Sequence, residues 1–363
     1  MFSIEKSNII SELQSLSNVA DKKQTLPVLS NVLIRCNSDK VQLKSTDLEV
    51  ELEVTLTSPT ITKPAEITIP AKKISDIVKE LPEGPLSFEL NDDATKMVVK
   101  SSSGKYNLST IPAADFPDFD IEASENFYEV ESEDLLSLIG KTSFAMANQD
   151  WRHYLNGCYI EKSLNALKMV ATDAHRLAIY ELVIEGEGEF KGIIPRKTVI
   201  EIMRILPKNE TIKFYLNTSN IVFMSKNFTF KSKLIDGNYP NYNQVVPSGD
   251  GIEIRANRKD LLDSLSRVSV LSNDKFKGVK LTANSSYLDV TAHNPEQESA
   301  EEKLELKSSV SGFDVAFNVN YLREILSTIE DEDISIVSYG PDKSAAVLSS
   351  DQNQTLVLMP LLL

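Results

Sequence analysis

Three segments of this 363-residue chain repeat one plan at a nearly constant spacing, and this repetition constrains the fold more than any other feature. The segments are residues 67–90, 192–216 and 315–339. Each reads as a short strand, a helix of about ten residues, a turn and another strand. Pro70, Pro195 or Asn318 stands where each helix should start, and Pro suits a first turn as Asn suits an N-cap.

A second element recurs with the same period. Residues 41–54 match residues 167–182, with Asp47 and Asp173 lying 126 residues apart, and residues 287–306 hold the equivalent place in the third copy. A helix with an apolar stripe opens each copy as well. Because chance similarity would not produce ordered matches at a constant period, we interpret the chain as three homologous domains.

The expected domains are residues 1–122, 123–249 and 250–363. Each should contain two amphipathic helices and many alternating strands. The fold class that follows is α+β, with two helices packed on antiparallel sheets in each domain.

Composition narrows the class of protein. A hydrophobic content of 41% and a charged content of 25% are ordinary for a folded chain. Cys36 and Cys158 are too few for a disulfide framework, so we expect a reducing cytoplasm. No signal peptide and no apolar run of about 20 residues is present, so we expect no membrane partner.

The net charge of −15 argues against nucleic acid as a partner. Basic residues nevertheless gather on the helices that the repeat predicts, as with Arg196, Lys197 and Arg204 on one of them. A basic helical surface attracts phosphates through counterion release. The alternative is that these residues simply populate solvent-facing helix positions.

The short motifs of the chain, taken in order, make it resemble one family over its whole length. They are Thr25-Leu26-Pro27-Val28-Leu29, Ser45-Thr46-Asp47-Leu48-Glu49, residues 108–117, Tyr154-Leu155-Asn156-Gly157, residues 171–177, Ile194-Pro195-Arg196-Lys197, Asp236-Gly237-Asn238-Tyr239-Pro240, Leu271-Ser272-Asn273, residues 294–298 and Met359-Pro360. With these motifs the chain resembles the bacterial β sliding clamps, the processivity (beta) subunits of DNA polymerase III. No single motif is specific, but the ordered set is.

The resemblance implies a head-to-tail homodimer closed into a ring around duplex DNA. Twelve helices packed ~8–10 Å apart would leave a hole of roughly 25 Å. A duplex about 20 Å wide passes through such a hole, and the contacts would be independent of sequence. The function implied is that of a DNA polymerase processivity factor without cofactors. Its implied partners are the polymerase alpha subunit, the clamp loader, and other replication and repair proteins that meet it in the cytoplasm, at the nucleoid.

Three candidate sites follow from the resemblance. The DNA-binding residues would be Lys22, Lys23, Gln24, Gln149, Arg152, His153, Tyr154, Arg196 and Lys197. A hydrophobic peptide-binding pocket would comprise Leu155, Thr172, Ala174, His175, Arg176, Leu177, Pro240, Val245, Val357, Leu358, Met359, Pro360 and Leu361. The dimer interface would set Lys73, Lys100, Lys105, Tyr106 and Leu108 against Val270, Leu271, Phe276, Glu296, Glu298, Glu301 and Glu302.

The sequence departs from the family pattern at a few of these positions. Lys23 and His153 stand where relatives often carry Arg and Tyr, and both keep polar contact with DNA possible. Gln244 and Leu362 replace residues that are usually basic in relatives. We therefore expect the preference among peptide partners to differ.

An enzymatic function finds little support. The chain contains only three histidines, His153, His175 and His293, which disfavours a multi-histidine metal site. It lacks the nucleophile elbow, the Walker loop and the dinucleotide-binding glycine motif. The alternative that remains open is a repeat-built protein–protein scaffold that never encircles DNA.

Overall fold

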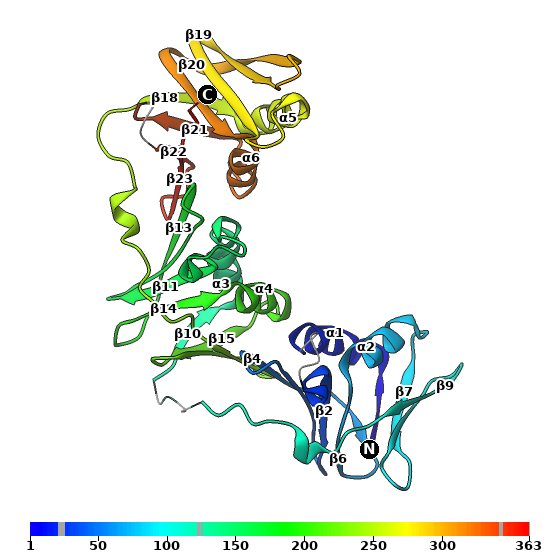
Figure 1. Ribbon diagram of the computed structural model, residues 1–363. Helices are drawn as coiled ribbons and strands as arrows, with labels where there is room; N and C mark the ends of the chain where they lie inside the picture. Colours follow the sequence, from blue (N-terminus) through cyan, green and yellow to red (C-terminus); the bar gives the residue numbers. More distant parts are fainter. Residues whose placement is uncertain (21–25, 122–123, 125, 341–343, 363) are drawn as a thin grey trace. The chain divides into compact units, whose positions relative to one another are not determined.

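The computed structural model describes residues 1–20, 26–121, 124, 126–340 and 344–362. Figure 1 labels the elements in chain order. The helices of the described residues are α1 (Ile10–Val19), α2 (Ala71–Glu80), α3 (Ser132–Gly140), α4 (Arg196–Ile205), α5 (Arg258–Val268) and α6 (Val319–Ser327). Two helices fall in each repeat, as the sequence predicts.

The helices begin where the repeat places them. Asn318 caps α6, since its side-chain oxygen accepts hydrogen bonds from the N–H groups of Asn320 (3.0 Å) and Tyr321 (3.3 Å). Pro70 differs slightly from expectation, because it is the N-cap of α2 rather than part of its first turn. Pro70 is also the last residue of strand β6, because proline has no N–H with which to continue the hydrogen bonding of the sheet.

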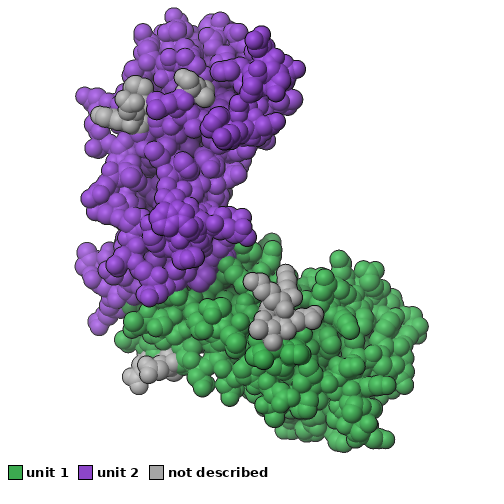
Figure 2. Space-filling view, in the orientation of Figure 1, with its two compact units in different colours: residues 1–133, 197–234 green, residues 134–196, 235–363 purple. Residues whose placement is uncertain are grey.

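The chain forms two compact units, coloured separately in Figure 2. Unit 1 comprises residues 1–133 and 197–234, and unit 2 comprises residues 134–196 and 235–363. The second repeat is therefore shared, because its strands join two different sheets.

A five-stranded antiparallel sheet of unit 1 has the order β5-β1-β7-β8-β9. Its strands are β1 (Phe2–Glu5), β5 (Thr60–Ile61), β7 (Pro85–Leu90), β8 (Lys96–Lys100) and β9 (Lys105–Ser109). Strand β9 lies at one edge, so one row of its backbone groups has no strand partner within the described residues.

An eight-stranded antiparallel sheet completes unit 1, in the order β10-β15-β16-β17-β4-β3-β2-β6. Its strands are β10 (Tyr128–Glu131), β15 (Thr211–Leu216), β16 (Asn220–Met224), β17 (Phe228–Lys233), β4 (Val50–Thr55), β3 (Val41–Thr46), β2 (Asn31–Cys36) and β6 (Ala65–Pro70). Strands of the first and second repeats meet where β4 pairs with β17. Helices α1 and α2 pack together and against β2, β3, β4 and β6.

Unit 2 contains the matching eight-stranded sheet, in the order β14-β11-β12-β13-β23-β22-β21-β18. Its strands are β14 (Phe190–Pro195), β11 (Gly157–Ser163), β12 (Ala166–Thr172), β13 (Arg176–Val183), β23 (Gln354–Leu358), β22 (Ala345–Leu348), β21 (Asp333–Ser338) and β18 (Ile252–Asn257). Here the second and third repeats meet where β13 pairs with β23.

A long hairpin of β19 (Gly278–His293) and β20 (Ser299–Asn318) completes the third repeat. Helices α5 and α6 pack against each other and against this hairpin, as Figure 1 shows. None of the helices in the described part of the chain is both long and apolar enough to cross a membrane. Among the same residues, no group of three or more His, Cys, Asp or Glu side chains is arranged to hold a metal ion.

Candidate functional site

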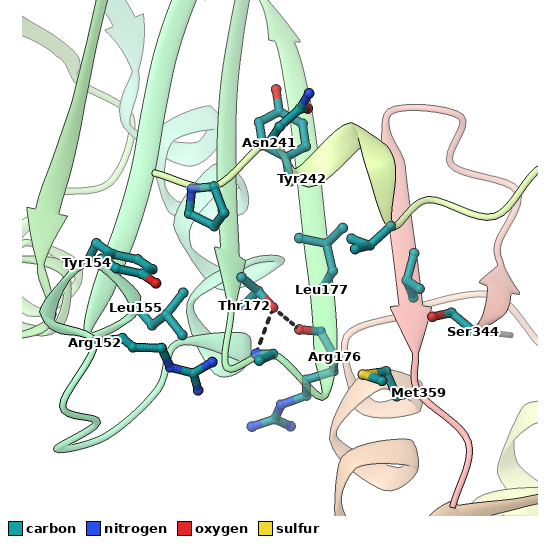
Figure 3. A pocket seen from close by; sticks show the side chains of 14 residues that line it. Arg152, Tyr154, Leu155, Thr172, Arg176, Leu177, Asn241, Tyr242, Ser344 and Met359 are labelled. Atoms are coloured by element: carbon teal, nitrogen blue, oxygen red, sulfur yellow. Dashed lines mark hydrogen bonds between the residues drawn. The ribbon is translucent and has the colours of Figure 1, made fainter. Parts of the chain in front are cut away.

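A cavity of about 280 Å³ opens in unit 2, beside the strand pair β13–β23. Its lining comes from the segment around the 3-10 helix η5 (His153–Leu155), the β12–β13 turn, residues 240–245, Ser344 just before β22, and β23 with the adjoining Met359. The full set is Arg152, Tyr154, Leu155, Thr172, Ala174, Arg176, Leu177, Pro240, Asn241, Tyr242, Val245, Ser344, Val357 and Met359. Figure 3 shows these side chains around the cavity.

The β12–β13 turn holds its shape through side-chain hydrogen bonds. Thr172 Oγ1 accepts from the Ala174 N–H (3.0 Å) and donates to the Arg176 carbonyl oxygen (2.5 Å), as the dashed lines in Figure 3 mark. Asp173 Oδ1 accepts from the N–H groups of His175 (2.9 Å) and Arg176 (3.1 Å). Ala174 has a φ of 74°, which a small residue tolerates better than a bulky one. The turn thus presents Leu177 to the cavity on a fixed backbone.

The floor of the cavity is apolar. Leu177 and Val357 face each other in the register of β13 and β23, and they pack with Val170, Ile179 and Tyr242 in one buried cluster. Met359 and Val245 are about half exposed at the rim, at 48% and 52%. An apolar floor with a flexible Met at its edge suits an apolar peptide side chain.

Two tyrosines behind the floor share one carboxylate. Glu161 accepts hydrogen bonds from the hydroxyl of Tyr242 and from that of Tyr159, the latter at 3.0 Å. The Tyr159 ring also stacks on Tyr239 at 4.9 Å. Burial, followed by the nearby Glu161 carboxylate, raises the pKa of Tyr159 to about 12, and burial raises that of Tyr242 as well. Both hydroxyls therefore stay protonated and keep donating at neutral pH.

Most residues of the predicted pocket line this cavity. The exceptions are His175, Leu358, Pro360 and Leu361. The His175 ring stacks on Tyr321 at 6.1 Å, and Leu358 is fully buried because neighbouring strand residues face opposite sides of the sheet. Pro360 and Leu361 line a separate cavity of about 190 Å³, beside the Ala316 carbonyl that accepts from the Leu361 N–H (2.7 Å).

The cavity also includes three residues that the sequence did not indicate, namely Asn241, Tyr242 and Ser344. The aromatic residue following the Tyr239-Pro240 motif was a usable signal for Tyr242. No feature of the sequence singles out Ser344.

The predicted DNA-binding residues fall into separate groups. Arg152 and Tyr154 lie at the pocket, and Arg152 makes a two-pronged ion pair with Asp150 at 2.8 and 3.0 Å. Hydrogen bonds from Arg152 lower the pKa of Asp150 to about 2. His153 and Gln149 are exposed nearby in sequence, and Gln149 has a φ of 58°.

Two of the remaining residues of this set, Arg196 and Lys197, already bond to groups of the chain itself. Arg196 Nη1 donates to the Met146 carbonyl oxygen at 3.4 Å within unit 2. Lys197 Nζ lies 2.6 Å from Asp47 Oδ2 and 2.9 Å from the Val19 carbonyl oxygen within unit 1. Lys22, Lys23 and Gln24 lie outside the residues that the structure describes.

The predicted interface residues occupy two places. In unit 1, the edge strand β9 contains Lys105, Tyr106 and Leu108, of which Tyr106 is exposed and Leu108 is buried. Lys100 forms an ion pair with Glu89 (2.6 Å). Lys73 is exposed on α2. In unit 2, Val270 and Phe276 are 78% and 54% exposed, while Leu271 is half-buried. Glu296, Glu298 and Glu301 are exposed, and Glu302 accepts two hydrogen bonds from Arg267.

Comparison with known proteins covers the whole chain. Residues 1–120, 129–241 and 243–362 match the N-terminal, central and C-terminal domains of the DNA polymerase III beta subunit. The Beta sliding clamps of Pseudomonas putida and Escherichia coli (strain K12) are 38% and 35% identical, over 99% of both chains in each case. A crystal structure of a DnaN sliding clamp from Pseudomonas aeruginosa bound to griselimycin matches with a TM-score of 0.94 at 36% identity, covering 100% of this chain and 99% of that one.

Proposed function

Since the chain belongs to the DNA polymerase III beta subunit family, the bacterial β sliding clamps, we propose that two copies close head to tail around duplex DNA and hold the replicative polymerase there. Members of this family are non-catalytic processivity factors, so the protein is a clamp and not an enzyme. The assignment of that function to particular residues of this chain is our proposal.

The pocket at β13–β23 is the observation that carries the proposal for partner binding. Its floor of Leu177 and Val357, with Met359 at the rim, offers apolar surface that a short peptide segment would bury. We propose that the polymerase alpha subunit, the clamp loader and other replication and repair proteins bind this pocket in turn. A relative that binds griselimycin supports using that compound as a probe.

A binding titration tests the pocket. Griselimycin should bind the wild-type chain, and the double variant Leu177→Lys with Met359→Ser should lose at least about tenfold in affinity, or ~1.4 kcal/mol. Leu164→Ser, at an exposed turn outside the cavity, is the control because Leu164 is 82% exposed. Unchanged affinity in the double variant would remove the pocket from the proposal.

We propose that Gln149, Arg152, His153, Tyr154, Arg196 and Lys197, with Lys22, Lys23 and Gln24, contact the phosphate backbone of the duplex. Mobile phosphate contacts suit sliding, because they do not depend on sequence. The relevant variant replaces Arg152, Arg196 and Lys197 by Glu. It should lose clamp-dependent processivity, whereas the same change at the exposed Lys213, Lys280 and Lys303 should not.

Retention on DNA separates this function from that of a protein–protein scaffold. A closed ring should stay on circular DNA and slide off the same DNA after linearisation. Equal retention on both forms, or processivity that survives the triple Glu variant, would favour a scaffold that never encircles DNA.

We propose that the dimer forms when the β9 edge of one copy meets the 270–276 segment and the acidic residues 296–302 of the other. The exposed Tyr106, Val270 and Phe276 would supply apolar area, and Lys105 would face carboxylates of the other copy. Light scattering should give a dimer mass for the wild type and a monomer mass for Tyr106→Glu with Val270→Asp.

We propose domains at residues 1–122, 123–249 and 250–363, which is supported by the ranges of the three matched family domains. We propose a cytoplasmic protein that associates with the nucleoid during replication, which is supported by its bacterial relatives.

A further inference from the structure

The pairing of β13 with β23, which underlies the pocket, has a counterpart in unit 1. There β4 pairs with β17, and the two registers correspond residue by residue: Leu177 faces Val357 in one pair, and Glu51 faces Lys231 in the other. Leu177 lies 126 residues after Glu51, and Val357 lies 126 residues after Lys231, which is the period of the repeat. The neighbouring strand pairs correspond in the same way, since Val170 faces Ile179 in β12–β13 and Lys44 faces Glu53 in β3–β4.

The turns that lead into these strand pairs have the same backbone and the same hydrogen bonds. Thr46 Oγ1 accepts from the Leu48 N–H (3.0 Å) and donates to the Val50 carbonyl oxygen (2.8 Å), as Thr172 does in its own turn. Leu48 has a φ of 73°, against 74° for Ala174. The backbone therefore forms the same arrangement of a turn and its paired strands twice. We call β3, β4 and β17 the first platform, and β12, β13 and β23 the second platform.

The side chains on the two platforms have opposite character. Val170, Leu177, Ile179 and Val357 form the apolar cluster under the pocket. Their counterparts Lys44, Glu51, Glu53 and Lys231 are all charged. Lys44 Nζ lies 3.5 Å from Glu51 and 3.3 Å from Glu53, and Lys231 Nζ lies 2.9 Å from Glu51. We call these four residues the charged cluster.

A contribution to the stability of the fold does not explain the charged cluster well. The Glu51 side chain is only 1% exposed, and its Oε2 makes no hydrogen bond with any described residue. Buried ion pairs of this kind often stabilise a fold no better than apolar residues of similar volume. They do resist an apolar ligand, because the ligand would have to desolvate or displace charges that are held together.

Apolar residues remain around the charged cluster. Leu29 holds the place that Leu155 holds in the pocket, and Leu26 and Leu48 are 50% and 36% exposed. The four charges are thus one chemical difference between the two platforms, and a second is the main chain at Phe119, whose carbonyl oxygen lies 3.4 Å from Lys231 Nζ.

We infer that the charged cluster closes the first platform to apolar peptides, so that each chain presents one binding pocket instead of two. A single pocket per chain fixes where a tethered partner can dock. This inference rests on the proposed function of the pocket, since it uses the same class of ligand.

The test transplants the pocket floor onto the first platform. The variant Lys44→Val, Glu51→Leu, Glu53→Ile, Lys231→Val should bind two griselimycin molecules per chain in a calorimetric titration, where the wild type binds one. The control Glu129→Leu with Lys213→Val removes an exposed cross-strand pair of the same sheet and should leave the ratio at one. A folded transplant that still binds one molecule would overturn the inference.

Two further measurements distinguish a failure of the inference from a variant that does not fold and from a failure of the proposed pocket. If the fourfold variant does not fold, Glu51→Leu with Lys231→Val alone should add a second, weaker site, and its absence in a folded protein counts against the inference. In the wild type, saturating griselimycin should slow amide exchange in β13 and β23 and leave β4 and β17 unchanged. Slowing in β4 and β17 would contradict the inference, whereas a wild type that binds nothing would contradict the proposed pocket.

Discussion

Arg176 and Glu324 form an ion pair that joins the first residue of β13 to helix α6 beside the pocket. Arg176 also bonds Asp173 Oδ2 (3.1 Å) and the Phe144 carbonyl oxygen (2.7 Å), and its guanidinium lies 4.5 Å from the centre of the Tyr321 ring. The side chain is 7% exposed. One arginine therefore links the turn, the strand and the helix that surround the site.

Replacing Arg176 with Leu should destabilise unit 2 by about 3 kcal/mol, because the mostly buried Asp173 carboxylate loses its charged partner. Urea denaturation followed by circular dichroism measures the change in the free energy of unfolding. Lys213→Ala breaks an ion pair between two side chains that are more than half exposed, and it should cost less than about 1 kcal/mol. Similar losses in the two variants would show that Arg176 does not link these elements.

The shared carboxylate of Glu161 leads to a prediction in alkaline solution. The pKa of Tyr159 is raised from 10.0 to about 12, chiefly by burial, so the folded state holds this proton more tightly than the unfolded state. The resulting stability is complete below about pH 10 and is lost as the pH rises towards 12. The ultraviolet absorbance of phenolate should show a late-titrating class of tyrosines. The variant Tyr159→Phe with Tyr242→Phe should reduce that class by two residues, while other tyrosines whose pKa is raised by burial, such as Tyr239, remain in it.

The repeat was enough to predict the helices and the fold class. Apolar spacing placed α2 and α6, and Asn318 acts as the predicted cap. The sequence could not predict that β4 pairs with β17, or β13 with β23, because such pairings join residues about 180 apart whose contact depends on the whole sheet. Two sheets therefore cross the boundaries between repeats, which sequence periodicity alone does not reveal.

The candidate pocket could be predicted in part. Its predicted members come from contiguous motifs, and the structure gathers most of them around one cavity. Leu358 could have been excluded, because strand alternation sends it to the face opposite Val357. Ser344 reaches the cavity only through the tertiary fold, so no local pattern could indicate it.

The two cysteines should be chemically inert in the folded protein. Burial raises the pKa of the Cys158 thiol from 9.0 to about 12, and burial also raises that of Cys36. A shift of this size lowers the thiolate fraction of Cys158 about a thousandfold, before any effect of access. Iodoacetamide followed by mass spectrometry should therefore label both thiols only after denaturation. Rapid labelling of Cys158 in the native protein would mean that this region opens readily.

The ion pair between Asp150 and Arg152 should limit the attraction for DNA. The pKa of Asp150 is lowered from 3.8 to about 2 by the Arg152 hydrogen bonds, so the pair is complete above about pH 4 and is lost only as the pH falls through about 2. At neutral pH the carboxylate therefore offsets the guanidinium charge. Asp150→Asn should raise affinity for duplex DNA severalfold and steepen its salt dependence by about one phosphate contact.

Glu129→Gln is the matched control for this prediction, because it removes the same charge from an exposed ion pair elsewhere. It should change DNA affinity little. Carboxyl NMR gives an independent check, since Arg152→Gln should return the pKa of Asp150 towards 3.8. If Asp150→Asn and Glu129→Gln raise DNA affinity equally, the gain comes from net charge and Arg152 does not contact the duplex.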